Sequence, residues 1–177
     1  MAAVIDATIG GENANSYCLL SEANTFHESR INSTTWDSAT DDQKIRALVT
    51  ATRLLDEHMD WEGTPTDEIQ RLCWPRLATV DTEGYLYDHL GREIGSDEIP
   101  EKLKEAVAEF ARLLLETDRT EDSTEGFSSV DVGPIGIGFS QGRPAERKVV
   151  PDAVYEMISQ WGDRYYARSS TVSLERC

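Results

Sequence analysis

The pentapeptide from Gly138 to Gly142 is the feature of this sequence with the clearest catalytic precedent. It reads Gly-Phe-Ser-Gln-Gly and matches G-x-S-x-G, the turn that exposes the nucleophilic serine of α/β-hydrolases. That chemistry also needs a helix directly after the serine and a histidine downstream of it. Here Gly142-Arg143-Pro144 follows, and His27, His58 and His89 all lie upstream. We predict a glycine-bearing hairpin turn and no enzyme; a hydrolase that uses Ser140 is the alternative.

Metal and cofactor motifs are also incomplete. The histidines and the three cysteines, Cys18, Cys73 and Cys177, stand at no spacing typical of a metal site. The run from Asp118 begins like a calcium-binding loop, but Ser123 and Ser129 stand where that loop needs glycine and glutamate. The glycines at 133–138 precede no Gly-Lys-Ser/Thr, so they form no P-loop. The sequence predicts neither a metal nor a cofactor.

The charge of the chain limits its partners. The 177 residues include 17 Lys and Arg against 33 Asp and Glu, a formal net charge of −16. A field of this sign repels phosphate and argues against a surface that binds nucleic acid by charge. It suits a wall that DNA passes without adhering.

Four tryptophans, Trp36, Trp61, Trp74 and Trp161, flank the expected helices. We predict that they lock loops onto the core, because a stacking platform for single-stranded nucleic acid would need a basic groove around them. The sequence has no apolar run long enough to span a membrane. The three widely spaced cysteines form no disulfide framework, and we expect synthesis in a reducing cytoplasm.

Hydrophobic periodicity predicts a mostly α fold, a bundle of three to four helices with extended N- and C-terminal arms. Expected helices cover 22–31 with Ser21 as N-cap, about 41–63, 66–72, 100–117 and 151–161, and small hairpins lie near 85–94 and 130–150. The strongest stripe is that of the third long helix, with Leu103, Val107, Phe110, Leu113 and Leu114. We divide the chain into an arm at 1–20, a helical domain at 21–161 and a tail at 162–177.

An ordered set of short motifs runs through residues 4–161 and is similar to one known family. The chain resembles the head–tail adaptor (connector) proteins of tailed bacteriophages, sequences that also carry the label DnaT-like single-stranded DNA-binding protein. The motifs are Asn15-Ser16-Tyr17, Ser21-Glu22-Ala23, Ala51-Thr52-Arg53, Leu55-Asp56, Trp61-Glu62-Gly63, Trp74-Pro75-Arg76, Ile99-Pro100 and Val132-Gly133-Pro134.

The resemblance implies a structural protein of the virion neck, made in the host cytoplasm. Such adaptors form a ring of about twelve copies. The ring joins the portal protein to a downstream neck or tail protein, and packaged double-stranded DNA passes through it without sequence-specific binding. The family pattern supplies no catalytic residue. The alternative function is a single-stranded DNA-binding protein of replication type, which requires a basic groove with aromatic stacking.

Two segments are the candidate contact sites. Tyrosine and arginine commonly anchor interfaces, and they gather in the C-terminal tail; the resemblance implies that this tail docks into the portal. The hairpin is expected to contact neighbouring subunits or the tail partner. The docking residues are Arg164, Tyr165, Tyr166, Arg168 and Arg176, and the hairpin residues are Val132, Pro134, Ile135, Ile137 and Phe139.

Overall fold

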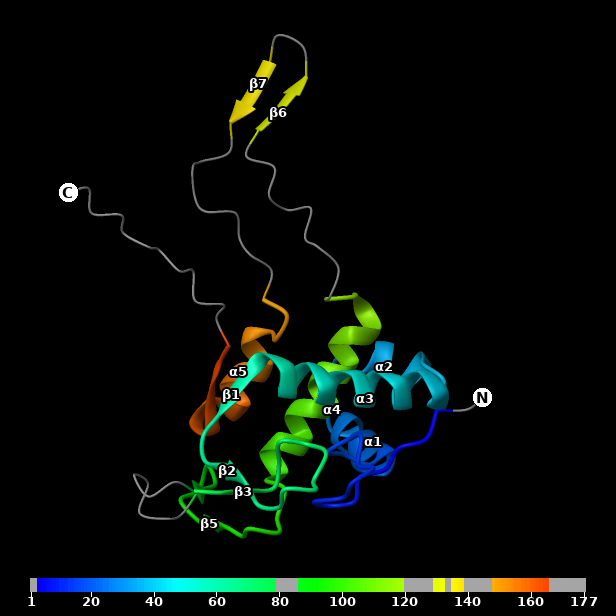
Figure 1. Cartoon of the computed structure of the whole chain (residues 1–177). Helices are drawn as coiled ribbons and strands as arrows, with labels where there is room; N and C mark the ends of the chain where they lie inside the picture. Colours follow the sequence, from blue (N-terminus) through cyan, green and yellow to red (C-terminus); the bar gives the residue numbers. More distant parts are fainter. Residues whose placement is uncertain (1–2, 79–85, 120–128, 133–134, 139–147, 166–177) are drawn as a thin grey trace, which may run out of the picture.

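The fold is mostly helical, as the sequence predicts, with four main helices packed together and small two-stranded hairpins (Figure 1). This computed structural model describes residues 3–78, 86–119, 129–132, 135–138 and 148–165. The helices are α1 (Leu20–Glu28), α2 (Thr34–Ser38), α3 (Asp41–His58), α4 (Glu101–Glu116), α5 (Asp152–Ile158) and the 3-10 turn Ser159–Trp161.

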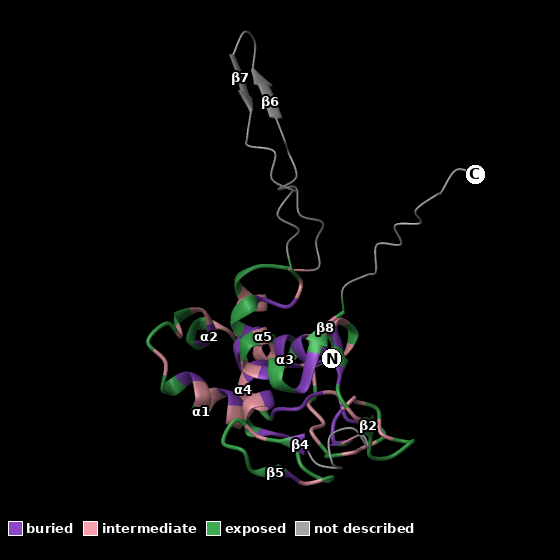
Figure 2. Ribbon diagram, turned by 90° about the vertical axis from the view of Figure 1, so that its left-hand side faces the viewer, coloured by how far each residue is buried: buried purple, intermediate pink, exposed green. Residues whose placement is uncertain are grey.

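Helix α4 is the centre of the core. Leu103, Val107 and Phe110 are fully buried, which confirms the predicted stripe. Small residues at Ala106, Ala108 and Ala111 let neighbouring helices approach closely. The helix packs against α3, α5 and α1, and Figure 2 shows its buried face turned toward them. Beyond Ala111 the stripe loses its cover, and Leu113, Leu114 and Leu115 are only partly buried.

Two helix starts show how local sequence sets the boundaries. At α3, the Gln43 N–H donates to Thr40 Oγ1 (3.4 Å) and the Thr40 N–H donates to Gln43 Oε1 (2.9 Å), a reciprocal capping box. At α1, the predicted Ser21 cap is wrong. The helix begins at Leu20, and the Glu22 carboxylate accepts the Leu19 N–H at 2.7 Å. The side chain that stabilises the start of α1 is therefore the Glu22 carboxylate, at the third position of the helix, and not the Ser21 hydroxyl.

The predicted helix at 66–72 is wrong: these residues form turns. Asp67 Oδ1 accepts the Ile69 N–H at 3.1 Å, which is a local side-chain turn that competes with a helix. Gln70 Nε2 donates to the carbonyls of Leu72 (2.7 Å) and Pro75 (3.1 Å), and this fixes the loop before the cis Trp74–Pro75 bond. The one-turn helix α2 was not expected.

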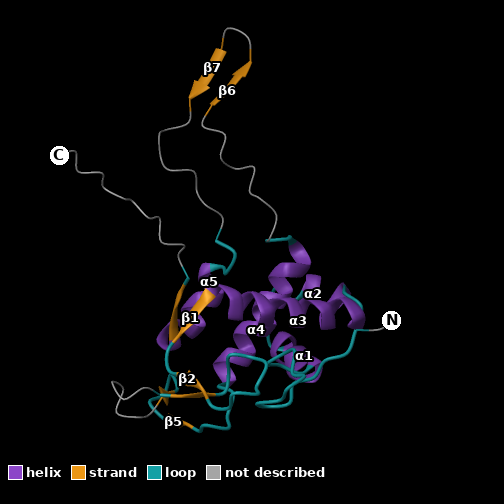
Figure 3. Cartoon of the chain, viewed as in Figure 1, coloured by secondary structure: helices purple, strands orange, loops and turns teal. Residues whose placement is uncertain are grey.

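Within the described residues the strands form four antiparallel pairs, and Figure 3 draws strands in orange. The predicted hairpin near 85–94 is confirmed by β4–β5. A hairpin also lies within 130–150, but it pairs Ser129–Val132 with Ile135–Gly138, so its turn comes before the predicted Gly138–Gly142 segment. The pair β1–β8 joins distant parts of the chain, with Met59 opposite Arg164 and Trp61 opposite Gly162. The strands are β1 (Met59–Trp61), β2 (Thr64–Pro65), β3 (Arg76–Leu77), β4 (Leu86–Tyr87), β5 (Glu93–Ile94), β6 (Ser129–Val132), β7 (Ile135–Gly138) and β8 (Gly162–Arg164).

The described residues of both expected arms are bonded to the helical domain. In the N-terminal segment, the Ala3 N–H donates to Asp42 Oδ1 (2.9 Å), and Asn15 Oδ1 accepts the Asp6 N–H (2.9 Å). Tyr17 and Cys18 are buried in the core. At the other end, β8 takes the first residues of the expected tail into the β1–β8 pair. No helix in the described ranges is long and apolar enough to cross a membrane.

Candidate functional site

All four tryptophans are core residues, at most 6% exposed, as the sequence predicts. Trp74 meets Trp61 and Trp161 edge-to-face, with ring centroids 6.0 and 5.7 Å apart. Trp161 Nε1–H donates to the Tyr87 carbonyl at 2.7 Å. Trp36 lies against the buried His27 ring, 4.5 Å between centroids. None of these rings is free to stack on a nucleic-acid base, because the protein already covers both faces.

A buried polar network holds the loop after α3. Tyr17 O–H donates to Asp56 Oδ1 at 2.6 Å, and the Cys73 N–H donates to Asp56 Oδ2 at 3.1 Å. The Trp74 N–H in turn donates to the Tyr17 oxygen at 3.1 Å. Burial raises the pKa of Asp56 and, together with the nearby Asp56 charge, raises the pKa of Tyr17 well above its usual range. These bonds join α3 to the N-terminal segment and to the loop that contains Cys73 and Trp74.

The Arg76 side chain also holds the loop that follows α3. Its guanidinium is buried and donates to backbone carbonyls, at 2.6 Å to Glu62, 3.0 Å to Cys73 and 3.2 Å to Trp61. It also contacts the Gly63 carbonyl. Burial lowers the pKa of Arg76. Arg76 of the Trp74-Pro75-Arg76 motif thus bonds to the backbone of the Trp61-Glu62-Gly63 motif. Local sequence patterns did not reveal this structural role.

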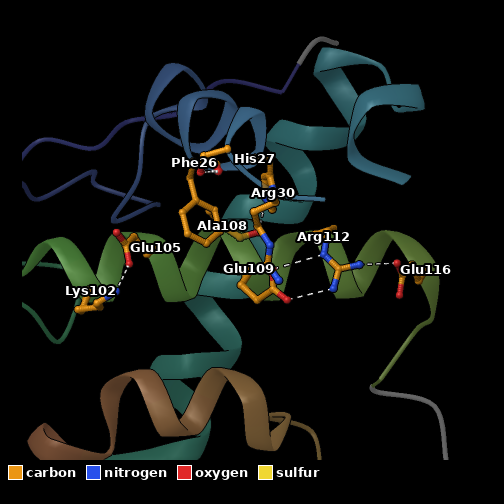
Figure 4. A network of polar contacts seen from close by, with 10 residues as sticks. Phe26, His27, Arg30, Lys102, Glu105, Ala108, Glu109, Arg112 and Glu116 are labelled. Atoms are coloured by element: carbon orange, nitrogen blue, oxygen red, sulfur yellow. Dashed lines mark hydrogen bonds and ion pairs between the residues drawn. The ribbon is translucent and has the colours of Figure 1, made fainter. Parts of the chain in front are cut away.

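Surface cations are largely engaged by carboxylates. In the network of Figure 4, Arg30 pairs with Glu109. Arg112 bridges Glu109 (3.0 Å) and Glu116 (2.5 Å) along α4. The Phe26 ring lies 5.4 Å from the Arg30 guanidinium carbon. Further pairs are Arg46–Asp42, Arg53–Glu57, Arg92–Asp88, Lys102–Glu105, Lys104–Glu22, Lys148–Asp152 and Arg164–Asp152. This pairing reduces the attraction of these side chains for phosphate.

Among the predicted docking residues, Arg164 and Tyr165 have different environments. The Arg164 side chain is 8% exposed, lies over the Tyr155 ring at 4.2 Å and pairs with Asp152 at 2.7 Å. Tyr165 follows it and is 68% exposed. The Arg164 side chain is therefore held against α5, whereas the Tyr165 side chain is exposed. Tyr166, Arg168 and Arg176 lie outside the described residues.

The predicted hairpin site is a two-stranded pair whose register is known. Val130 stands opposite Ile137 and Val132 opposite Ile135, and Asp131 stands opposite Gly136. Directly opposed residues share a face of the pair. One face therefore carries four β-branched apolar residues, here called the apolar hairpin face. Pro134, Phe139 and Ser140 lie outside the described residues.

A groove between α3 and the end of α4, here called the α3–α4 groove, has a volume of about 420 Å³. Its floor is apolar, formed by Ala47, Leu114 and Leu115. Arg46 and Arg53 border it, with side chains 64% and 58% exposed. Sequence patterns did not indicate this groove, because it forms only where α3 lies beside the end of α4. The remaining lining residues are Gln43, Thr50 and Asp118.

Within the described ranges, no three His, Cys, Asp or Glu side chains come together as a metal site would require. The candidate features that the structure describes are the apolar hairpin face, the α3–α4 groove and the exposed Tyr165.

Comparison with known proteins gives one finding. No curated protein and no solved structure matches the chain. A family model does match, over residues 1–177, and its description is “Putative DnaT-like ssDNA binding protein”. That match spans the whole chain, including the residues that bond to Asp56 and Arg76. The protein therefore belongs to this DnaT-like family.

Proposed function

We propose that this protein is a structural component of a bacteriophage neck. In this role it is a ring-forming adaptor that joins the portal to the next neck or tail protein and lines the DNA exit channel. The observation that carries the proposal is the β6–β7 pair with its apolar hairpin face.

An isolated two-stranded hairpin is marginally stable in water. Neither β6 nor β7 pairs with another strand among the described residues. By register, Val130, Val132, Ile135 and Ile137 lie on one side of this pair, and an apolar surface that covers that side would stabilise the pair. A second copy or a partner protein supplies that cover in an assembly, and this supports a structural role.

The electrostatics suit a channel wall. The chain has a net charge of −16, and ion pairs engage cations such as Arg30 and Arg112. DNA therefore meets a surface that repels its phosphates and slides past it. The proposal assigns portal docking to the tail from Tyr165 onward, with Arg164 as its fixed base.

The test is to mix the purified protein with purified portal protein and to image the product by electron microscopy. A ring on the narrow end of the portal is expected. Ile137→Glu places a charge on the apolar hairpin face and is expected to abolish the ring. The control Ile31→Glu changes a residue that is 98% exposed and should leave the ring intact. If the two folded proteins do not associate, the adaptor role is refuted.

Single-stranded DNA binding is the second candidate, favoured by the description of the family. Among the described surfaces, the α3–α4 groove fits it best, because Arg46 and Arg53 border an apolar floor. Fluorescence anisotropy with a labelled oligo-dT strand measures it. Micromolar affinity that falls steeply with salt, and that Arg46→Glu with Arg53→Glu removes, would establish this function instead.

A further inference from the structure

The apolar stripe of α4 runs past the core and ends in the α3–α4 groove. Ala111 is fully buried, whereas Leu114 and Leu115, one turn further on, are only partly buried. Together with Ala47 of α3 they form the floor of the groove. A partner that covers this floor removes apolar area from water, which favours association. The walls of the groove show what kind of partner fits.

One wall of the groove is a single face of α3. Its residues are spaced three or four apart, which places them on one side of a helix; they are Gln43, Arg46, Ala47, Thr50 and Arg53. From Gln43 to Arg53 this wall is about 15 Å long at 1.5 Å per residue, close to three helical turns. The end of α4 forms the other wall. A helical segment of about three turns therefore matches the groove in length.

The backbone around the groove favours a helix over a strand as the occupant. All lining residues except Asp118 belong to α3 or α4, where backbone N–H and C=O groups are bonded within the helix. The walls therefore offer no strand edge to an extended segment, whose own polar backbone would face an aliphatic floor without partners. A helix bonds its backbone internally and presents only side chains. The groove thus suits an amphipathic helix.

The charge of the lining favours an acidic partner. Two arginines outnumber the one aspartate in the α3–α4 groove. Two other hollows of the described surface have the opposite balance. One is lined by Glu22, Glu101 and Glu105 without a cation, and the other has four carboxylates against Arg92 and Lys102. Charges act over about 8 Å in physiological salt, so a docked segment responds to the lining of the groove more than to the net charge of the chain.

The two arginines are able to change partners. Arg46 pairs with Asp42 at 2.8 Å and Arg53 pairs with Glu57 at 3.1 Å, each within α3. The arginine side chains are 64% and 58% exposed, and exposed ion pairs of this kind contribute little to stability. Arg46 and Arg53 stand seven residues apart, about 10 Å along the helix. Carboxylates at the same spacing on a helix that lies along α3 therefore face both of them.

We propose that the α3–α4 groove binds an acidic amphipathic helix of a partner protein. The apolar face of that helix covers Leu114 and Leu115, and two carboxylates, two turns apart, pair with Arg46 and Arg53. Single-stranded DNA fits the groove less well, because the described lining has no aromatic ring on which a base could stack. The inference goes beyond the neck role and does not depend on it, because the groove lies within one chain.

Fluorescence anisotropy with a synthetic peptide tests the proposal on the full chain. The probe is a labelled peptide of about 15 residues, with leucines at helical spacing and glutamates seven residues apart. Two control peptides have the same residues in scrambled order, or lysine in place of each glutamate. The acidic peptide should bind with micromolar affinity, about tenfold or more tightly than either control. In NMR spectra, the methyl signals of Leu114 and Leu115 should shift as this peptide is added.

Charge reversal in the groove provides a second test. Arg46→Glu with Arg53→Glu should weaken binding of the acidic peptide about tenfold or more and strengthen binding of the lysine peptide. The control, Arg71→Glu with Arg92→Glu, makes the same change in net charge at two exposed residues that do not line the groove. It should change either affinity by less than about twofold. Circular dichroism checks that both variants are folded.

Three results would overturn the proposal. An acidic peptide that binds no better than its scrambled form would refute recognition of an amphipathic helix. Oligo-dT that binds wild type but not the groove variant, while the acidic peptide binds neither, would assign the groove to DNA. Self-association that the groove variant loses in analytical ultracentrifugation, again without binding of the peptide, would assign the groove to a second copy. Ring formation on the portal is measured separately, so the neck role stands or falls on its own experiment.

Discussion

Replacing Tyr17 by phenylalanine should destabilise the domain by about 3 kcal/mol. The change removes one hydroxyl and leaves the ring in place. Two bonds are lost: the 2.6 Å donation to Asp56 and the 3.1 Å acceptance from the Trp74 N–H. A hydrogen bond to a charged group contributes about 1.5–3 kcal/mol, and an orphaned buried N–H costs about 1–3 kcal/mol. Relief from burying the hydroxyl returns about 1–2 kcal/mol, so the net loss stays near 3 kcal/mol.

Urea unfolding followed by tryptophan fluorescence measures this loss, because Trp74 lies within the network. The matched control is Tyr155→Phe, which removes a 2.9 Å donation to the exposed Asp163. That bond competes with water, so its loss should cost below about 1 kcal/mol. Equal losses in the two variants, at an unchanged m-value, would refute the argument that burial gives the Tyr17 network its strength.

Three further predictions concern the same loop. Gly63→Ala should lower the free energy of unfolding, measured by thermal unfolding, by about 2 kcal/mol or more, because φ is +77° and a Cβ would meet the Leu77 carbonyl oxygen at 2.1 Å. The control Gly91→Ala, at φ +75° in open space, should lower it by only about 1 kcal/mol. Arg76→Lys should lower the free energy of unfolding by about 2–4 kcal/mol, since an ammonium cannot reach carbonyls from four residues; a smaller loss in urea unfolding would contradict this reading. Burial raises the pKa of Asp56 above 3.8, so its stabilising contribution is complete below that pH and declines as pH rises through the higher folded value. The stability of wild type minus that of Asp56→Asn should therefore fall as the pH rises above about 4 in urea titrations, and a rise would contradict the assignment.

Local pattern was sufficient for the long helices. The stripe of Leu103, Val107 and Phe110 predicts α4, because a helix can bury residues spaced in this way on one face, whatever covers them. The acidic first turn of α3 and the turn signals near 85–94 were also readable, since caps and turns are formed by neighbours in sequence. The turn of the later hairpin was predicted at Gly138–Gly142, whereas the strands pair across the residues before it. Residues 66–72 were misjudged because Asp67 and Gln70 bond to nearby backbone in place of a helix.

Of the candidate surfaces, one is readable from the sequence and the others depend on the tertiary structure. The apolar alternation of the β6–β7 hairpin is visible in the sequence, because a strand repeats every second residue. The α3–α4 groove is not, since its floor joins Ala47 to Leu114 and Leu115. The burial of Arg164 is equally hidden, because it depends on Tyr155 and Asp152 from α5.

By itself the sequence determined the helical class, the net negative charge and the burial of the tryptophans. Those properties follow from composition and from periodicities shorter than one helix. Only the tertiary structure decided that Asp56 bonds to Tyr17, 39 residues away, and that β8 pairs with β1. It alone also showed that Arg76 holds a loop by its carbonyls. Such contacts join residues far apart in the chain, and their strength comes from the exclusion of water when the whole core closes.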